Sequence, residues 1–535
     1  MKLSSFLILL CLFNQVIAQV NTGNVPSISS NYDLIITNGR ILDGTGNSWY
    51  RADIGIRGKR IAFIGHISTP QSAAARVIDA KGQVVSPGFI DVHTHIEEDE
   101  ARNPTTDNFI HDGVTTVITG NCGSSKLDLG NYFRYLDSLK LSINVASLIG
   151  HNDVRKSVMG TANRPPSPAE MEKMESLVEK AMKDGAAGLS TGLIYVPGTY
   201  STTPEITGLA RVAAKYNGVY ATHMRSESDS VLEAIGEALE IGKEASIPVE
   251  ISHFKVGGQR KPGMSIRTLQ LVEEARARGI DVTIDQYPYT ASSTSLNSLL
   301  PAWVLEGDKT TIRSRLEEET TRKAVIAEML IRLKRRGRKH YDYAVVTNYP
   351  FDTGFNGRSI EQINRLMGKR HSRKQEARTI LSMVINGGAQ MVFHGMWEED
   401  VRRIMQYPFN ITGSDASIRI FGEGVPHPRG YGSNARVLAK YVREEKLISL
   451  EEAVRRMTSL PARKFHLKDR GLLLEGYYAD LIIFDENNIR DESTYTNPHA
   501  YSKGVSYVIV NGQLVVEEGK HLGTRSGETL RVNSD

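Results

Sequence analysis

The stretch Val84–Asp99 reads VVSPGFIDVHTHIEED and places His93 and His95 one residue apart, directly after a run of apolar and β-branched residues. Side chains alternate between the two faces of a β-strand, so both imidazoles point to the same side. Imidazole is the commonest metal ligand, and a strand holds such a pair firmly. An HxH motif alone is equally typical of a strand end with solvated or core histidines, so evidence from the rest of the chain is needed to choose between a metal site and structural histidines.

The composition is that of a globular protein. The chain has 535 residues, of which 40% are hydrophobic and 24% charged, with a net charge of +4. This length exceeds one ordinary domain and is typical of a large barrel with a smaller second domain. So small a positive surplus, spread over the whole chain, argues against a nucleic-acid partner. The composition leaves the oligomeric state open.

The N-terminus, MKLSSFLILLCLFNQVIAQ, has one lysine, an apolar run over Phe6–Phe13 and a small residue at Ala18. This pattern predicts a secretory signal peptide over residues 1–18, too short to span a membrane, with cleavage after Ala18. Lipoprotein processing at Cys11 is the second alternative, because leucines rather than small residues precede it. We therefore expect an exported protein, periplasmic or secreted.

One cysteine, Cys122, is left once the signal peptide is removed. The mature chain then cannot form an intramolecular disulfide, although the compartment expected after export is oxidising. Cys122 fits either a small buried hydrophobic residue, as most free cysteines are, or a thiolate that binds a metal or acts as a nucleophile.

The two ends of the chain share one pattern. Residues 31–87 and 467–535 contain short β-rich segments separated by Asn-Gly, Asp-Gly and Lys-Gly turn signals. Such segments predict antiparallel strands. We expect both ends to join in one β-sandwich domain.

The middle of the chain, residues 88–466, alternates helices that have apolar residues at i, i+3 and i+4 with short β-branched strands. This alternation predicts a parallel sheet, and its length favours a (β/α)₈ TIM-type barrel in the α/β class. Residues 291–340 interrupt the pattern with Arg-, Lys- and Glu-rich helices. Their mixed charge favours an inserted helical lid over a nucleic-acid contact.

Polar residues follow the predicted barrel strands where chemistry collects in such enzymes. A single one is more often structural, whereas six in succession indicate a site. Imidazole and thiolate ligands suit Zn²⁺, which lowers the pKa of a water molecule that it binds to about 7. Asp415 would then accept that water's proton. The predicted metal ligands are His93, His95, Cys122, His223 and His253.

The motifs PGFIDVHTH, GNCG, THMRSE, SHFK, YPYTA, GSDA and PHPR occur in this order over nearly the whole mature chain. In them the sequence resembles the amidohydrolase superfamily, specifically the N-acyl-D-amino-acid deacylases, or D-aminoacylases. The resemblance implies a tightly held zinc on Cys122, His223 and His253. It also implies a weaker second site on His93 and His95, bridged by the same cysteine. Many amidohydrolases carry a carboxylated lysine at the bridge, so the cysteine separates this chain from the hydantoinases and dihydroorotases.

The resemblance also implies that Arg429, Lys255 and Tyr287 bind the substrate carboxylate and that Tyr195 lines the pocket. An arginine fork pairs bidentately with a carboxylate, and a phenol and an ammonium can complete such a cage. Each residue alone also fits a surface arginine, a solvated lysine or a core aromatic. The segment that follows Asp415, ASIRIFGEGVPHPR, is longer than the corresponding family loop, which implies a pocket of different depth.

The function implied is zinc-dependent hydrolysis of the linear amide of N-acyl-D-amino acids, a small-molecule substrate, with Asp415 as general base and then general acid. A dipeptidase or cyclic-amide hydrolase on the same scaffold is the alternative among enzymes. A non-catalytic exported binding protein is the alternative outside enzymes, although a capture site has no need of a positioned base. The preferred D side chain, the acyl group and the number of metals in the working enzyme stay open.

Overall fold

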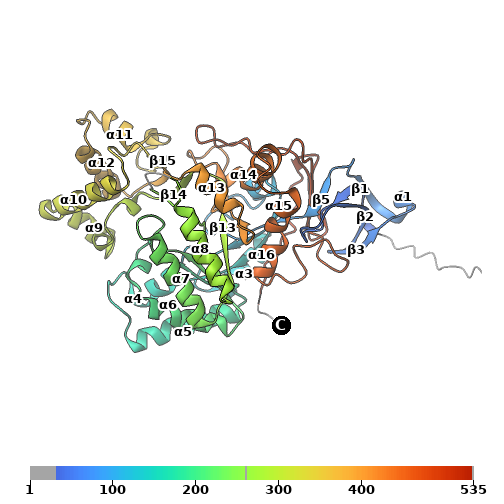
Figure 1. The fold of residues 1–535 in the computed structure, drawn as a ribbon, viewed down its shortest axis with the longest axis horizontal. Coiled ribbons are helices and arrows are strands. Elements are labelled where there is room, and N and C mark those ends of the chain that lie inside the picture. Colours follow the sequence, from blue (N-terminus) through green and yellow to red (C-terminus); the bar gives the residue numbers. More distant parts are fainter. Residues whose placement is uncertain (1–31, 259–261, 533–535) are drawn as a thin grey trace, which may run out of the picture.

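The computed structural model describes residues 32–258 and 262–532. Figure 1 shows three parts along the longest axis: a β-sheet domain at one end, a barrel in the middle and an inserted unit, drawn in yellow, at the other end. The predicted signal peptide at 1–18 lies outside the described residues. Within those residues, every helix is too short or too polar to cross a membrane.

Both ends of the chain contribute to one nine-stranded sheet. Strand β5 joins them, since it pairs antiparallel with β18 and parallel with β1. The sheet is therefore mixed, whereas the sequence predicted antiparallel strands. Strand β1 also pairs parallel with β4. Ile54 and Ile483, from opposite chain ends, belong to one buried cluster. The elements are β1 Tyr32–Ile41, β2 Tyr50–Arg57, β3 Arg60–Gly65, α1 Pro70–Ala73, β4 Ala74–Asp79, β5 Val84–Pro87, β18 Leu481–Phe484, β19 Val505–Val510, β20 Gln513–Glu517 and β21 Lys520–His521.

Eight parallel strands form the barrel. The short strands β8 and β9 follow each other directly and together make its third strand. Hydrogen bonds join β6, β7 and β8 in one run and β9 to β13 and then β17 in another. A parallel bridge between Thr94 and Ala416 joins the first strand to the last and closes the ring. The strands are β6 Phe89–Asp91, β7 Val114–Thr119, β8 Asn144–Ser147, β9 Ile149–Gly150, β10 Gly188–Gly192, β11 Val219–His223, β12 Val249–Ile251, β13 Val282–Gln286 and β17 Asn410–Thr412.

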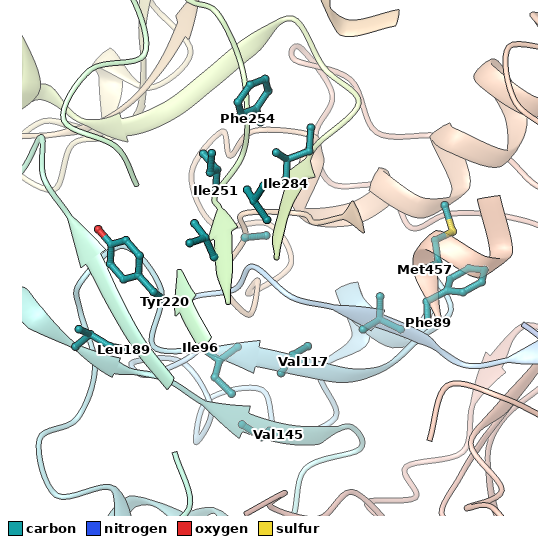
Figure 2. Close-up of a cluster of buried hydrophobic side chains, with 14 of the residues drawn as sticks. Phe89, Ile96, Val117, Val145, Leu189, Tyr220, Ile251, Phe254, Ile284 and Met457 are labelled. Atoms are coloured by element: carbon teal, nitrogen blue, oxygen red, sulfur yellow. The ribbon is translucent and has the colours of Figure 1, made fainter. Parts of the chain in front are cut away.

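Side-chain alternation along these strands builds the barrel core. Figure 2 shows Val117, Val145 and Tyr220 in the cluster that packs against the surrounding helices. Their chain neighbours Ile118, Ala146 and Ala221 belong instead to a second cluster inside the ring. Because both faces are covered, the strands consist of buried residues throughout, as all six residues of β7 are.

Helices follow most of the barrel strands and cover their outer face, as the alternating pattern predicts. The longest of them, α5, begins at Ser167 with a capping box, in which Ser167 and Glu170 bond each other's backbone N–H groups. The helices are α2 Asp107–Ile110, α3 Leu129–Leu139, α4 His151–Met159, α5 Pro168–Lys183, α6 Thr203–Ala214, α7 Val231–Ala245, α8 Met264–Ala277, α13 Glu398–Met405, α14 Arg429–Arg436, its continuation Val437–Glu444, α15 Leu450–Met457, α16 Ser459–Lys464 and a short turn Gly198–Tyr200.

The inserted unit extends to His394, whereas the sequence predicted a helical insertion ending at residue 340. Strand β14 pairs antiparallel with β16, and β16 pairs with β15, so the unit is closed only when the chain reaches β16. The local pattern could not show this pairing because the strands lie about a hundred residues apart. The unit has its own hydrophobic core. Its elements are β14 Ala291–Ser295, short turns Leu296–Leu299, Ala302–Leu305 and Thr353–Phe355, α9 Lys309–Glu317, α10 Glu319–Arg335, β15 Ala344–Asn348, α11 Ile360–Leu366, α12 Arg373–Ile385 and β16 Gln390–His394.

Candidate active site

The six predicted strand-end residues meet at the carboxyl end of the barrel, the end where parallel strands place catalytic groups. His93 and His95 follow β6, Cys122 follows β7, and the remaining residues end or follow β11, β12 and β17. Three of the six, Cys122, His253 and Asp415, have positive φ angles of 53°, 36° and 53°. Left-handed backbone is costly for such residues and concentrates at functional sites, where the surrounding structure enforces it.

The first group of converging atoms comes from Cys122, His223 and His253. The Cys122 Sγ lies 3.6 Å from the His223 Nδ1 and 3.6 Å from the His253 Nε2, and these two nitrogens lie 2.7 Å apart. Tetrahedral zinc with ordinary Zn–N and Zn–S bonds separates its ligand atoms by about 3.3–3.7 Å. Small movements of the two imidazoles therefore convert this group into a zinc site, which the donor set of one sulfur and two nitrogens suits.

The second group consists of His93, His95 and Asp415. The Asp415 Oδ1 lies 3.3 Å from the His95 Nε2 and 3.7 Å from the His93 Nε2. The Cys122 Sγ lies 3.3 Å from the same His93 nitrogen, so the thiol belongs to both groups. The arrangement can hold two metal ions that share the Cys122 sulfur.

Two carboxylates that the sequence analysis missed orient these ligands. The Asp285 Oδ2 accepts a hydrogen bond from the His93 Nδ1 at 3.2 Å, and the Asp285 Oδ1 accepts one from the His253 backbone N–H at 2.8 Å. Glu227 lies 2.9 Å from the His253 Nδ1. Carboxylates in such positions fix the imidazole that faces a metal. Asp285 is the penultimate residue of the strand VTIDQ, so it carried a signal like that used for the other residues, whereas Glu227 lies four residues beyond β11 in the motif THMRSE.

The charges favour the metal-binding forms of three ligands, Cys122, His223 and His253, whereas the acidic groups around His93 and His95 raise the pKa of these two imidazoles. Burial alone would raise the pKa of the Cys122 thiol, yet the neighbouring His93 and His95 bring that pKa below its ordinary value. Burial holds the pKa of His223 and the pKa of His253 well below the ordinary value. The cysteine therefore tends towards the thiolate and these two imidazoles stay neutral, which are the forms that bind metal.

The residues expected to bind a carboxylate lie beside the metal-binding groups. The Arg429 Nη1 lies 2.7 Å from the Asp415 Oδ2, and the guanidinium lies over the Tyr287 ring at 4.7 Å. The Lys255 Nζ lies 5.6 Å from the same ring and pairs with Glu227. Among the described residues, the buried Tyr287 hydroxyl has no hydrogen-bond partner. A hydroxyl and two cations around one ring can receive a carboxylate.

Tyr195 lies beside the metal-binding His223. Its hydroxyl is 3.5 Å from the His223 Nδ1 and 3.0 Å from the Thr294 Oγ1 on strand β14. Two cavities meet here, and both are lined by Tyr195, Thr294 and Asp415. One extends past Lys255 towards the inserted unit, and the other extends past Arg429. A substrate can therefore place different substituents in two directions from the metal centre.

A closed (β/α)₈ barrel with imidazole, thiolate and carboxylate groups at its strand ends defines a metal-dependent hydrolase. The sequence matches the model of the amidohydrolase family over residues 76–516, and the chain belongs to this family. The predicted superfamily, fold class and enzyme class are confirmed.

Similar proteins narrow the family further. The chain is 35% identical to a D-aminoacylase of Alcaligenes xylosoxydans xylosoxydans, over 94% of this chain and 98% of that protein. It is 34% identical to an N-acyl-D-glutamate deacylase of the same organism, over 93% of this chain and 96% of the relative. The crystal structure of an N-acyl-D-glutamate deacylase from Bordetella bronchiseptica, complexed with zinc and a phosphonate mimic of the tetrahedral intermediate, superposes with a TM-score of 0.79. Its sequence is 34% identical, over 94% of this chain and all of that one.

Proposed function

We propose that this chain hydrolyses the amide bond of N-acyl-D-amino acids with zinc as cofactor, releasing a carboxylic acid and a free D-amino acid. The observation that carries the proposal is the position of Asp415 between two groups of residues. One Asp415 oxygen faces the metal-binding His95 at 3.3 Å, and the other faces Arg429 at 2.7 Å. The relatives that are named D-aminoacylase and N-acyl-D-glutamate deacylase support this reaction and substrate class.

The metal-binding residues would hold one zinc ion on Cys122, His223 and His253 and a second on His93 and His95, with the cysteine shared. Zinc supplies a Lewis acid for the acyl carbonyl and lowers the pKa of water. The zinc in the related crystal structure supports this cofactor.

The geometry explains how Asp415 can serve both halves of the reaction. In an N-acyl-amino acid, the amide nitrogen lies between the acyl carbon and the Cα that carries the carboxylate. Asp415 occupies the corresponding position, between His95 and Arg429. It accepts a proton from the attacking water, whose oxygen bonds the acyl carbon, and delivers that proton to the nitrogen as the C–N bond breaks.

The substrate carboxylate supplies the second anchor. Arg429 offers a bidentate fork, Tyr287 offers an unpaired hydroxyl, and the guanidinium lies over the Tyr287 ring in a buried site. Holding the carboxylate there fixes the distance from the amide to the proton carrier, which is how binding energy lowers a reaction barrier.

We also propose that the chain is exported, since its first residues carry the signal-peptide pattern described above. N-terminal sequencing of the mature protein tests this, with cleavage after Ala18 expected. An uncleaved N-terminus would contradict export, whereas lipid attached at Cys11 would replace cleavage after Ala18 with lipoprotein processing.

The reaction is tested with purified, zinc-loaded protein and a panel of N-acetyl-D-amino acids, N-acetyl-L-amino acids, dipeptides and hydantoins. Release of a free D-amino acid from the first group alone is expected. Preferred turnover of dipeptides or hydantoins would replace this function with one of the two enzyme alternatives. Binding of the panel without turnover would make the chain a binding protein.

A further inference from the structure

Two arginines of the inserted unit line the same cavity as the metal-binding residues. Arg336 and Arg338 follow helix α10, and they line this cavity together with His223, His253 and Asp415. Neither belongs to a motif that the sequence analysis used. In Figure 1 the inserted unit lies beside the barrel, so these loops bring charge to the metal site from outside the barrel.

Aromatic and backbone contacts position both guanidinium groups. Arg336 and Arg338 lie over the same buried Tyr343 ring, at 5.9 Å and 5.3 Å from its centroid. The Arg338 Nη2 donates a hydrogen bond to the backbone carbonyl of His394 at 3.2 Å. The stem of Arg336 packs 3.3 Å from the place where a Cβ on Gly258 would stand, on the loop after β12. Gly258 therefore lets Arg336 lie against the barrel.

The cavity has more positive than negative charge available. Its two acidic lining residues already have cationic partners, since Glu227 pairs with Lys255 and Asp415 with Arg429. No ion pair found among the described residues includes Arg336 or Arg338. Two guanidinium groups held on one ring, without a carboxylate between them, form a binding site for an anion.

We propose that Arg336 and Arg338 bind a carboxylate on the substrate's side chain, so that the preferred substrates are N-acyl derivatives of acidic D-amino acids. This inference rests on the proposed function. The side chain, rather than the acyl group, is assigned to this cavity because Lys255 and Tyr287 line it too. Those two residues bind the α-carboxylate together with Arg429, which lines the neighbouring cavity, and the side chain leaves from the same Cα. The acyl group then lies towards the neighbouring cavity with His95 and Cys122.

The experiment compares substrates that differ only in charge. For the zinc-loaded enzyme, kcat/KM is measured with N-acetyl-D-glutamate, its neutral isostere N-acetyl-D-glutamine, and N-acetyl-D-aspartate. We expect the two acids to exceed the glutamine derivative by about ten- to a hundred-fold, the equivalent of one charge-assisted hydrogen bond.

Arginine variants connect this preference to the residues. Arg336→Gln should lose about ten-fold or more on N-acetyl-D-glutamate, mainly through KM, and change N-acetyl-D-glutamine by less than about three-fold, because only the charged contact is removed. Arg336→Lys should keep part of the preference, and Arg336→Glu should favour N-acetyl-D-lysine. Arg335→Gln is the matched control, since Arg335 is the exposed neighbour that lines a different surface cavity.

A second set of substrates tests whether the arginines bind a carboxylate on the amino-acid side chain or one on the acyl group. N-succinyl-D-leucine and N-butyryl-D-leucine differ by a carboxylate on the acyl group. If Arg336→Gln lowers kcat/KM for the succinyl derivative instead of that for N-acetyl-D-glutamate, the arginines bind the acyl group and the side-chain assignment is wrong.

Binding measurements distinguish failure of this inference from failure of the proposed function. Calorimetry with D-glutamate and D-glutamine needs no turnover, and D-glutamate should bind more tightly to the wild type than to Arg336→Gln. Hydrolysis of both acetyl derivatives without a charge preference would overturn the inference and leave the function standing. Tighter D-glutamate binding without any hydrolysis would support the subsite and overturn the function.

Discussion

The Arg429 Nη1 lies 2.7 Å from the Asp415 Oδ2, which joins the group proposed to bind the substrate carboxylate to the group proposed to move the proton. Both side chains are nearly buried, and Asp415 also contacts His95. Although burial acts in the opposite direction, Arg429 and His93 hold the pKa of Asp415 well below its ordinary range. A substrate carboxylate that engages Arg429 therefore weakens the contact that keeps Asp415 a poor base.

Replacing Asp415 should remove catalysis without removing the metal. Asp415→Asn keeps the shape but cannot accept the water's proton, so kcat should fall by about 10²–10⁴-fold, the usual contribution of a general base. The tightly held zinc should stay at the wild-type occupancy, since Cys122, His223 and His253 are intact. Kinetics and elemental analysis of the same samples test both statements. Near-normal hydrolysis in the variant with full zinc would show that Asp415 is not the proton carrier.

Replacing Arg429 with lysine should weaken the carboxylate anchor although the charge is kept. The variant loses the bidentate fork, and a charge-assisted hydrogen bond contributes about 1.5–3 kcal/mol, so kcat/KM should fall by about ten- to a hundred-fold. The wild type should discriminate strongly between an N-acetyl-D-amino acid and its carboxamide, and Arg429→Lys should discriminate much less. Equal discrimination by the two proteins would exclude Arg429 from the carboxylate site.

The two metal groups should respond differently to removal of a ligand. Cys122→Ala should lose the tightly held zinc because its sulfur belongs to both groups, whereas His93→Ala should mainly lower occupancy of the second site. Zinc per chain, measured after dialysis against a weak chelator, should rank wild type first, His93→Ala next and Cys122→Ala last. Equal zinc in wild type and Cys122→Ala would refute the shared ligand.

A buried carboxyl beneath the site should make stability depend on pH. Burial, with the charge of Asp285, raises the pKa of Glu250 from 4.5 to about 8 in the folded protein. The folded state therefore holds this proton more tightly, and the resulting stability is complete below about pH 4.5 and is lost as the pH rises through about 8.

Glu250→Gln stays neutral at every pH, so its Tm should exceed the wild-type Tm by more at pH 8.5 than at pH 5.5. Differential scanning calorimetry at the two pH values gives this comparison. Glu244→Gln, at an exposed position on the helix before β12, is the control and should show no such change. A wild-type-minus-variant difference in Tm that is the same at both pH values would contradict the raised pKa.

Local pattern predicted the barrel and the identity of the residues that meet in the site. Strand and helix periods are properties of neighbouring residues, so the alternation over 88–466 predicted parallel strands, and a polar residue after each strand indicated the site. The local sequence pattern did not predict the parallel pairing of β1 with β4, or the end of the inserted unit at His394. Both depend on hydrogen bonds between segments that are far apart in the sequence.

The sequence by itself determined which side chains lie at the ends of the barrel strands. It therefore determined the chemistry of the metal site, which has one sulfur, four imidazoles and a carboxylate available. Only the tertiary structure decided how these groups are combined. It placed Asp285 behind His93, Glu227 behind His253 and Arg429 against Asp415, and it brought Arg336 and Arg338 from the inserted unit into a cavity that His223 and His253 also line. Residue type is a local property that a motif records, whereas the partner of a charged side chain is set by tertiary packing, whether it lies 14 residues away, as Arg429 does from Asp415, or 192 away, as Asp285 does from His93.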